Sequence, residues 1–274
     1  AVIGDGSQRW GDLCNVVSEE GLIHRLRSGG VSWPIRRGDV SGAKMLKSLW
    51  HTKEPVNFVA MADGLFLVKF GLREDRERIL NMAHWSFDQC LFSMVPFVKG
   101  QDISRYCFLF VPFWVRIFNI PLEKMERQVA IDIGSAIGEV LAIDRRDREG
   151  CWVEYIRVRV KLDISKSLRR VVYMVGDDGE EILCAINYER LRTFCYLCGC
   201  IGHHTHKCGM YERIKGAENL EFQYGNWLRA QMGQLNQSTD MWRNGIETIK
   251  VGGRKKRENG RSESTVDEGN FVMK

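Results

Sequence analysis

Cys195-Tyr-Leu-Cys198-Gly-Cys-Ile-Gly-His203-His-Thr-His-Lys-Cys208 carries three cysteines and a histidine at the spacing Cys-x2-Cys-x4-His-x4-Cys. Three thiolates and one imidazole form a ligand set that tetrahedral Zn²⁺ prefers. So short a loop cannot bury enough apolar surface to order itself, so metal binding has to supply the folding energy, roughly 10–16 kcal/mol in zinc-finger peptides. The spacing therefore predicts one structural zinc ion, bound by Cys195, Cys198, His203 and Cys208.

The residues between these ligands agree with a small metal-bound loop. Gly199 and Gly202 permit the positive φ angles that a chain needs to wrap tightly around an ion. Tyr196 and Ile201 are apolar, so an unstacked nucleic-acid base can rest against them, and Lys207 adds positive charge.

Other interpretations of the cysteines stay open at this point. They could be a chance cluster of buried or redox-active thiols, and Cys200, His204 and His206 could compete as ligands. A zinc ion with four protein ligands has no open position for water, so the site is expected to be structural rather than catalytic.

The regions upstream predict an α+β fold. Apolar residues recur at helical spacing over 42–51 and 72–83, and short apolar runs typical of strands occupy 56–61, 65–70 and 90–97. A preceding segment, 21–27, forms either a first strand or a helix. The order helix, strand, strand, helix, strand is typical of a ferredoxin-like or RRM-like sandwich.

A second unit is expected to begin at Phe110. It starts with a strand over 111–120 and a helix over 123–137 that ends at Gly138. The strands expected to follow span 139–144, 155–164, 171–175 and 181–188. Gly176-Asp-Asp-Gly179 joins the last two as a tight turn.

Tyr155-Ile-Arg-Val-Arg-Val-Lys-Leu-Asp-Ile164 alternates strictly between apolar and cationic residues. In a strand, this alternation directs Arg157, Arg159 and Lys161 to one face. The pattern favours equally a half-buried strand with a solvated cationic face and a surface that follows phosphates.

Composition restricts the class of protein. The chain has 274 residues, 44% of them hydrophobic, and a net charge of +5, which is typical of a folded, mildly basic protein. Nine cysteines without a secretory signal indicate a reducing, intracellular compartment, nuclear or cytoplasmic. The longest apolar run, 107–120, is too short to span a bilayer, so we expect no membrane association. The chain starts with Ala1 rather than Met and is interpreted as a possible fragment.

The carboxyl-terminal residues are polar and basic. Arg254-Lys-Lys-Arg257 suits a nuclear-import signal or a phosphate contact, and equally a solvated, disordered end. We therefore predict four regions: a poorly defined segment 1–34, an α+β domain 35–160, a region 161–210 of basic strands and the zinc-binding loop (a zinc knuckle), and a flexible tail 211–274.

Several segments resemble a plant family of retrotransposon-derived, gag-like proteins, in which a domain of unknown function precedes a Cys-x2-Cys-x4-His-x4-Cys zinc knuckle. The resemblance extends over about residues 35–230 and includes Lys44–Trp50, Trp85–Asp88, Val111–Arg116, Asn187–Leu191 and Tyr224–Ala230. It implies zinc and nucleic-acid binding, with the metal ligands at the four positions named above. His84 departs from the family pattern, in which a Pro or a similar residue usually precedes the Trp-x-Phe-Asp motif.

The sequence thus predicts a non-enzymatic protein that binds single-stranded RNA or DNA, within a gag-like ribonucleoprotein. The expected contacts are Tyr196, Ile201, Lys207, Arg190, Arg192, Arg157, Arg159 and Lys161. The alternative is a self-associating scaffold whose knuckle contacts protein. We expect no enzyme and no small-molecule substrate, because no Gly-rich phosphate loop, nucleophile elbow or His-Glu-x-x-His motif occurs. Asp177-Asp178, which could suggest a Mg²⁺ site, lies between two turn glycines.

Overall fold

The computed structural model describes residues 21–27, 49–61, 65–82, 84–87, 90–144, 154–211, 222–231 and 246–249, the first of these ranges by its backbone. The chain divides into two compact units. One comprises Ala1–Val111, Asp163–Ser167 and Arg192–Gln223, and the other Pro112–Leu162, Leu168–Leu191 and Tyr224–Lys274. The division after Val111 lies close to the expected start of the second unit at Phe110.

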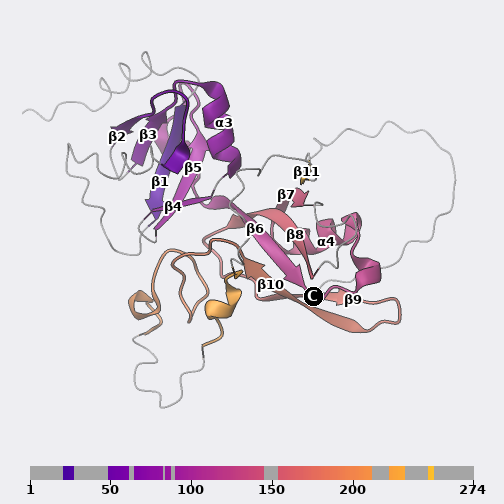
Figure 1. The fold of residues 1–274 in the computed structure, drawn as a ribbon. Helices are drawn as coiled ribbons and strands as arrows, with labels where there is room; N and C mark the ends of the chain where they lie inside the picture. The colour runs from indigo at the N-terminus through magenta and orange to yellow at the C-terminus, as the bar shows by residue number, and fades with distance from the viewer. Residues whose placement is uncertain are drawn as a thin grey trace, which may run out of the picture. The chain divides into compact units, whose positions relative to one another are not determined.

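The first unit is built on a five-stranded sheet in the order β2-β3-β1-β5-β4 (Figure 1). Its elements are β1 (Gly21–Arg27), β2 (Asn57–Ala60), β3 (Leu65–Lys69), α3 (Arg73–Met82), β4 (Trp85–Phe87) and β5 (Cys90–Pro96). The segment 21–27, open between helix and strand in the sequence, is a strand that pairs antiparallel with β3 and β5. If the short hairpin strand β4 is left out, the sheet order is β2-β3-β1-β5. Counted along the chain, these are the second, third, first and fourth strands, which is the ferredoxin-like arrangement.

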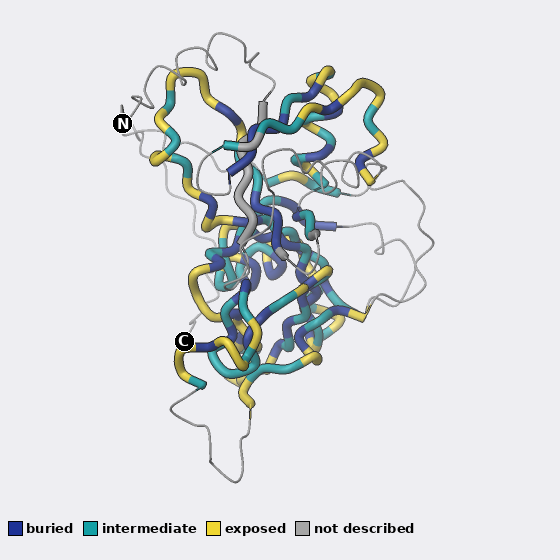
Figure 2. Tube along the Cα trace, turned by 90° about the vertical axis from the view of Figure 1, so that its left-hand side faces the viewer, coloured by how far each residue is buried: buried dark blue, intermediate teal, exposed yellow. Residues whose placement is uncertain are grey.

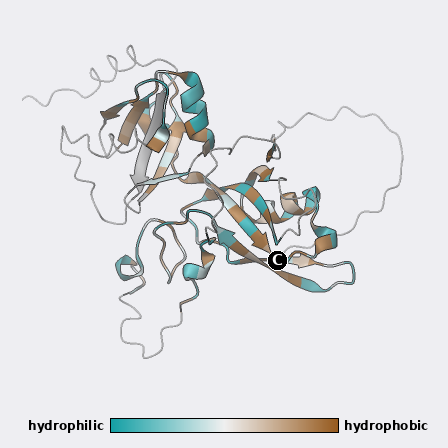
Figure 3. Ribbon diagram, viewed as in Figure 1, coloured by the Kyte–Doolittle hydropathy of each residue, from teal (hydrophilic) through white to brown (hydrophobic). Residues whose placement is uncertain are grey.

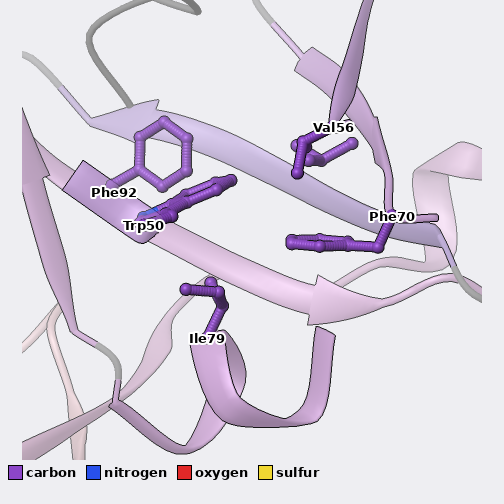
Figure 4. Close-up of a cluster of buried hydrophobic side chains, with 6 residues drawn as sticks. Trp50, Val56, Phe70, Ile79 and Phe92 are labelled. Atoms are coloured by element: carbon purple, nitrogen blue, oxygen red, sulfur yellow. The ribbon is translucent and has the colours of Figure 1, made fainter. Parts of the chain in front are cut away.

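The helix expected over 42–51 lies mostly outside the described residues, but Leu49 and Trp50 are helical. Trp50 is 0% exposed and is the centre of the core on one face of the sheet. Its ring stacks on those of Phe58 and Phe70, and meets Trp85 and Phe92 edge-on. Figure 4 shows Ile79 pointing from the helix towards this group. These aromatic contacts fix the helices against the sheet.

Helix α3 is mostly polar, and in Figure 3 it is drawn largely in the hydrophilic colour. Its buried residues are Asp75 and Ile79. Asp75 accepts a hydrogen bond from the backbone N–H of Lys53 at 2.8 Å and pairs with Arg78 at 3.0 Å. Burial opposes the charge of Asp75, but Arg78 and the backbone donors lower the pKa of this carboxyl below its usual value.

The opposite face of this sheet is also covered, because the chain folds back over it after β5. Leu65 and Leu67 point to this face and are 6% and 1% exposed. Phe97, Phe108, Ile103 and Tyr106 belong to the same cluster. The hydroxyl of the buried Ser93 donates to the backbone oxygen of Phe108 at 3.0 Å, which holds the segment in place. Both faces of the first sheet are therefore occupied by the chain itself.

The second unit contains a six-stranded sheet in the order β11-β7-β8-β6-β10-β9. Its elements are β6 (Phe110–Phe118), α4 (Arg127–Ile137), β7 (Glu139–Asp144), β8 (Tyr155–Asp163), β9 (Val171–Val175), β10 (Glu181–Tyr188) and β11 (Ile246–Thr248). Strands β7, β8, β6 and β10 repeat the ferredoxin-like order. A ferredoxin-like sandwich has a second helix between its third and fourth strands. In this unit the corresponding residues 164–170, all of which are described, contain no helix. The α+β fold with ferredoxin-like, RRM-like units is confirmed.

The alternation predicted for β8 is confirmed. Ile156, Val158, Val160 and Leu162 are buried, whereas the residues between them are half-buried. Figure 2 colours the described residues by burial, and buried, intermediate and exposed stretches follow one another along the tube. Helix α4 covers the apolar face, so closely that a Cβ added at Gly138 would lie 2.5 Å from the backbone oxygen of Lys161. Gly138 follows the last helical residue, as expected, although the helix begins at Arg127 rather than at 123.

Two described parts of the region 211–274 pack against the second sheet. Strand β11 pairs with β7. Residues 226–230 lie along the end of β10. There the backbone N–H of Ala230 donates to the backbone oxygen of Tyr188 at 3.0 Å, and Arg229 Nε donates to the backbone oxygen of Leu191 at 2.9 Å. Leu228 is 0% exposed, and its burial holds this part against the sheet. Among the described helices, none is long and apolar enough to cross a membrane.

Candidate metal centre and nucleic-acid interface

The four predicted ligands lie together on a tight loop. Phe194 and Ile201 form an antiparallel bridge at its base, and within it the backbone N–H of Gly199 donates to the oxygen of Cys195 at 2.9 Å. Gly199 and Gly202 have φ angles of +70° and +102°, which confirms that the loop uses the freedom of glycine.

A short 3₁₀ helix, η5 (Thr205–Lys207), then brings the last ligand to the others. The ligand atoms of Cys195, Cys198, His203 and Cys208 all lie within 4.8 Å of one another, and Cys198 Sγ is 3.4 Å from His203 Nε2. In a tetrahedral site with Zn–S near 2.3 Å and Zn–N near 2.0 Å, ligand atoms are about 3.5–3.8 Å apart. The cluster therefore fits a zinc ion.

The electrostatics of two of the ligand thiols, Cys195 and Cys198, also suit a bound cation. Burial disfavours the thiolate of Cys195, but the backbone N–H groups of Cys198 and Leu197 donate to its sulfur at 3.4 Å, and the pKa of Cys195 is lowered. Burial and the neighbouring sulfurs raise the pKa of Cys198. Thiolates this close repel one another, whereas a bound divalent ion deprotonates a coordinating thiol outright. A single zinc ion therefore removes the conflict.

The three side chains that could have competed as ligands, Cys200, His204 and His206, are not part of the cluster of ligand atoms. Cys200 Sγ lies 4.0 Å from the hydroxyl of Ser167 and 3.9 Å from the backbone oxygen of Ser165. His204 and His206 are exposed and stack on each other with ring centroids 5.5 Å apart. Among the described residues, only the four predicted ligands form a group suited to a metal.

The two apolar residues expected to contact a base differ in exposure. Tyr196 is half-buried, and its backbone N–H donates to the hydroxyl of Thr205 at 3.0 Å. Its ring lies against Phe194, with centroids 5.0 Å apart. Ile201 is 5% exposed, so its side chain belongs to the interior of the loop and offers little surface to a ligand.

Three of the predicted cations are exposed: Arg190, Arg192 and Lys207. Arg190 has φ +54° directly after Glu189, at the end of the second sheet. Arg192 Nε donates to the hydroxyl of Ser86 at 3.1 Å. Lys207 ends η5, one residue before the ligand Cys208. Arg190 and Arg192 thus precede the first ligand in the chain, and Lys207 lies between the third and the fourth.

The cations of β8 are not simply solvated. Arg157 forms ion pairs with Glu189 and Asp144, and its guanidinium lies 4.0 Å from the ring centre of Trp114. Lys161 pairs with Glu139 at 3.0 Å. Burial and the Arg157 cation lower the pKa of Arg159 to about 10, so Arg159 is still charged at neutral pH. Much of the charge of this strand is therefore balanced within the protein.

The carboxylate partners of the β8 cations and one aromatic neighbour of the knuckle were not predicted from the sequence. Asp144 lies opposite Arg157 across β7 and β8, which could have been found once the strands were aligned. Phe222 lies against Tyr196, with ring centroids 6.5 Å apart. Phe222 is fourteen residues beyond Cys208, and no local spacing signals that the chain returns there.

Comparison with known proteins identifies the knuckle. Residues 162–210 match the family model of a zinc knuckle. The chain is 34% identical to an uncharacterized Arabidopsis thaliana protein over 98 residues, which are 36% of the chain and 31% of that protein. The match thus spans about a third of the relative's length.

Two solved structures show weak overall similarity. A complex of Sxl-lethal protein with RNA is 15% identical, with a TM-score of 0.24, over 62% of this chain and 99% of that one. The first two RRM domains of the yeast poly(U)-binding protein Pub1 are 10% identical, with a TM-score of 0.21, over 61% of this chain and 98% of that one.

Proposed function

We propose that this protein is a zinc-dependent nucleic-acid-binding protein that prefers single strands. The observation that carries the proposal is the zinc knuckle at 195–208, in which the half-buried Tyr196 lies next to the ligand Cys195 and is fixed by Thr205. Stacking of a base on an aromatic side chain contributes roughly 1–3 kcal/mol and tolerates any base sequence. In a duplex, stacking on the neighbouring base pairs covers the faces of the bases, so such a contact favours an unpaired strand.

The phosphate contacts of this proposal are assigned to the exposed cations. Arg190, Arg192 and Lys207 are exposed, whereas Arg157 has a structural role, because two carboxylates balance its charge. Arg159 and Lys161 supply weaker, secondary contacts, since one is half-buried and the other is paired. The first sheet contributes no open face, because its own chain covers both sides.

The four zinc ligands all come from side chains of the protein, so the metal shapes the surface and leaves no position at which it could activate water. We therefore assign the knuckle to binding rather than to catalysis. A single knuckle has weak affinity, and assembly of several copies on one strand would strengthen binding by avidity.

Fluorescence anisotropy with a labelled single-stranded RNA, measured at rising salt, tests the proposal. For a single strand, the logarithm of the affinity should fall by about 0.7 per phosphate contact for each log unit of salt. Replacing Arg190, Arg192 and Lys207 by Gln should reduce this slope. Lys53→Gln, at a lysine that is 73% exposed, should leave it unchanged. A flat response to salt, or full binding after removal of zinc, would overturn the proposal.

A scaffold role is a second candidate, favoured by one surface. Tyr173 on β9 and Leu183 on β10 are cross-strand partners, and each is 43% exposed. β9 is at the edge of its sheet, and an exposed apolar pair at an edge suits a protein contact. Oligomers that persist after nuclease treatment, and that Tyr173→Ser dissociates, would favour this role.

We further propose that the protein functions in a retrotransposon-derived, gag-like ribonucleoprotein in the nucleus or cytoplasm. The order of α+β units followed by a knuckle, and the resemblance over 35–230, support this context. Sequencing of the flanking genomic DNA tests it, and a neighbouring reverse transcriptase frame is the expected result.

A further inference from the structure

We propose that Phe222, which lies outside the knuckle sequence, forms with Tyr196 a two-ring site for one unpaired base. This inference rests on the proposed function and specifies where a base binds. Phe222 is 43% exposed, whereas Tyr196 is half-buried. Neither the spacing of the zinc ligands nor the match over 162–210 includes Phe222.

Three aromatic rings lead from the interior of the knuckle to its surface. Phe194 is 2% exposed and lies against Tyr196 at an interplanar angle of 52°. The ring of Tyr196 then meets that of Phe222 at 70°. The buried ring thus supports the middle one, and the outermost ring presents apolar surface to solvent.

The position of Tyr196 is fixed from several sides. Its backbone N–H is held by Thr205, and it follows directly on the metal ligand Cys195. The bridge between Phe194 and Ile201 closes the loop beneath it. These contacts hold the backbone of Tyr196, and Phe194 packs against its ring, so the side chain has less freedom to lose when a ligand stacks on it, which reduces the entropic cost of binding.

The angle between Tyr196 and Phe222 determines the kind of ligand. At a centroid distance of 6.5 Å nothing fits between the two rings, but nearly perpendicular rings form a corner. A flat base can stack on the face of one ring and place its edge against the other, and both arrangements are favourable for aromatic systems. The exposed Lys207 lies two residues after Thr205 in the chain and adds positive charge to the same loop.

Binding of a labelled 12-nucleotide single-stranded RNA to the full chain tests this site. Phe222→Ala should weaken binding by about 5- to 100-fold while leaving the salt slope unchanged, because stacking neutralises no phosphate. Phe222→Tyr keeps a ring and should retain most of the affinity. Met210→Ala removes another exposed apolar side chain, 50% exposed, and should bind like wild type.

The outcomes separate this inference from the function on which it rests. If wild type binds and Phe222→Ala binds equally well, the two-ring site is wrong and the proposed function stands. If wild type retains no RNA, the proposed function itself fails. Zinc content is measured in parallel: a Phe222→Ala protein that loses both RNA and zinc would show that Phe222 only supports the knuckle, which also overturns the site.

Discussion

Arg157 and Glu189 form an ion pair with two contacts, Nε to Oε1 at 2.9 Å and Nη2 to Oε2 at 2.8 Å. Arg116 donates to the same Oε1 at 2.8 Å, and Asp144 accepts from Nη1 of Arg157 at 2.6 Å. The four side chains are 3–15% exposed and their charges cancel. They connect β6, β7 and β8 with the end of β10, so the second sheet depends on their balance.

Removal of one charge should upset this balance. Glu189→Gln leaves two arginines facing an uncharged amide, and breaking a buried ion pair at one partner costs about 3–5 kcal/mol. Urea denaturation at pH 7 should show a loss of this size. Asp177→Asn is the matched control, because Asp177 pairs with Lys124 but is 89% exposed, and an exposed pair contributes little. Equal losses in both variants would refute the structural role of Glu189.

The same network predicts how stability depends on pH. Burial opposes the charge of Glu189, but Arg157 and Arg116 hold its pKa below the usual value. A carboxyl whose pKa is lower in the folded state stabilises the protein above its unfolded pKa, and this contribution is lost as pH falls through the folded pKa. The stability difference between wild type and Glu189→Gln should therefore narrow on acidification from pH 7. A difference that widens would contradict the assignment.

Trp50 should be among the most sensitive positions of the first unit. Its side chain is fully buried and contacts four aromatic rings. Trp50→Ala should lower the free energy of unfolding by about 3–5 kcal/mol. Leu49→Ala, at a neighbour that is 49% exposed, should change it by less than about 0.5 kcal/mol. The urea midpoints of the two variants provide the measurement.

Local sequence patterns predicted the helices and strands well, but they did not predict contacts between residues that are far apart in the chain. Alternation located β8, and Gly138 located the end of α4, because each depends on neighbouring residues. The pairing of Arg157 with Glu189 depends on how strands far apart in the chain align, and the contact of Phe222 with Tyr196 depends on the path after Cys208. The zinc ligands were predictable because all four lie on one short loop and their chemistry fixes their spacing.

The end of α4 lies so close to β8 that a methyl group added at Gly138 should destabilise the protein. Gly138→Ala would place a Cβ 2.5 Å from the backbone oxygen of Lys161 and 2.9 Å from Val160. Backbone cannot yield as a flexible side chain can, so a loss of about 1–3 kcal/mol is expected. Gly209→Ala, where a Cβ would meet nothing within 4 Å, is the control. Thermal unfolding that ranks the two variants in the opposite order would count against the packing.

Substitution of Cys198 or of Cys200, two residues further along the chain, tests which of the two binds the metal. Cys198 Sγ lies 3.4 Å from His203 Nε2, whereas Cys200 Sγ lies near Ser165 and Ser167. Elemental analysis of purified protein should find one zinc ion per chain in wild type and in Cys200→Ser, and close to none in Cys198→Ser. Because thiols and imidazole must lose their protons to bind, zinc should also dissociate from wild type as the pH falls. Zinc lost from Cys200→Ser but kept by Cys198→Ser would mean that Cys200 replaces Cys198 as the ligand.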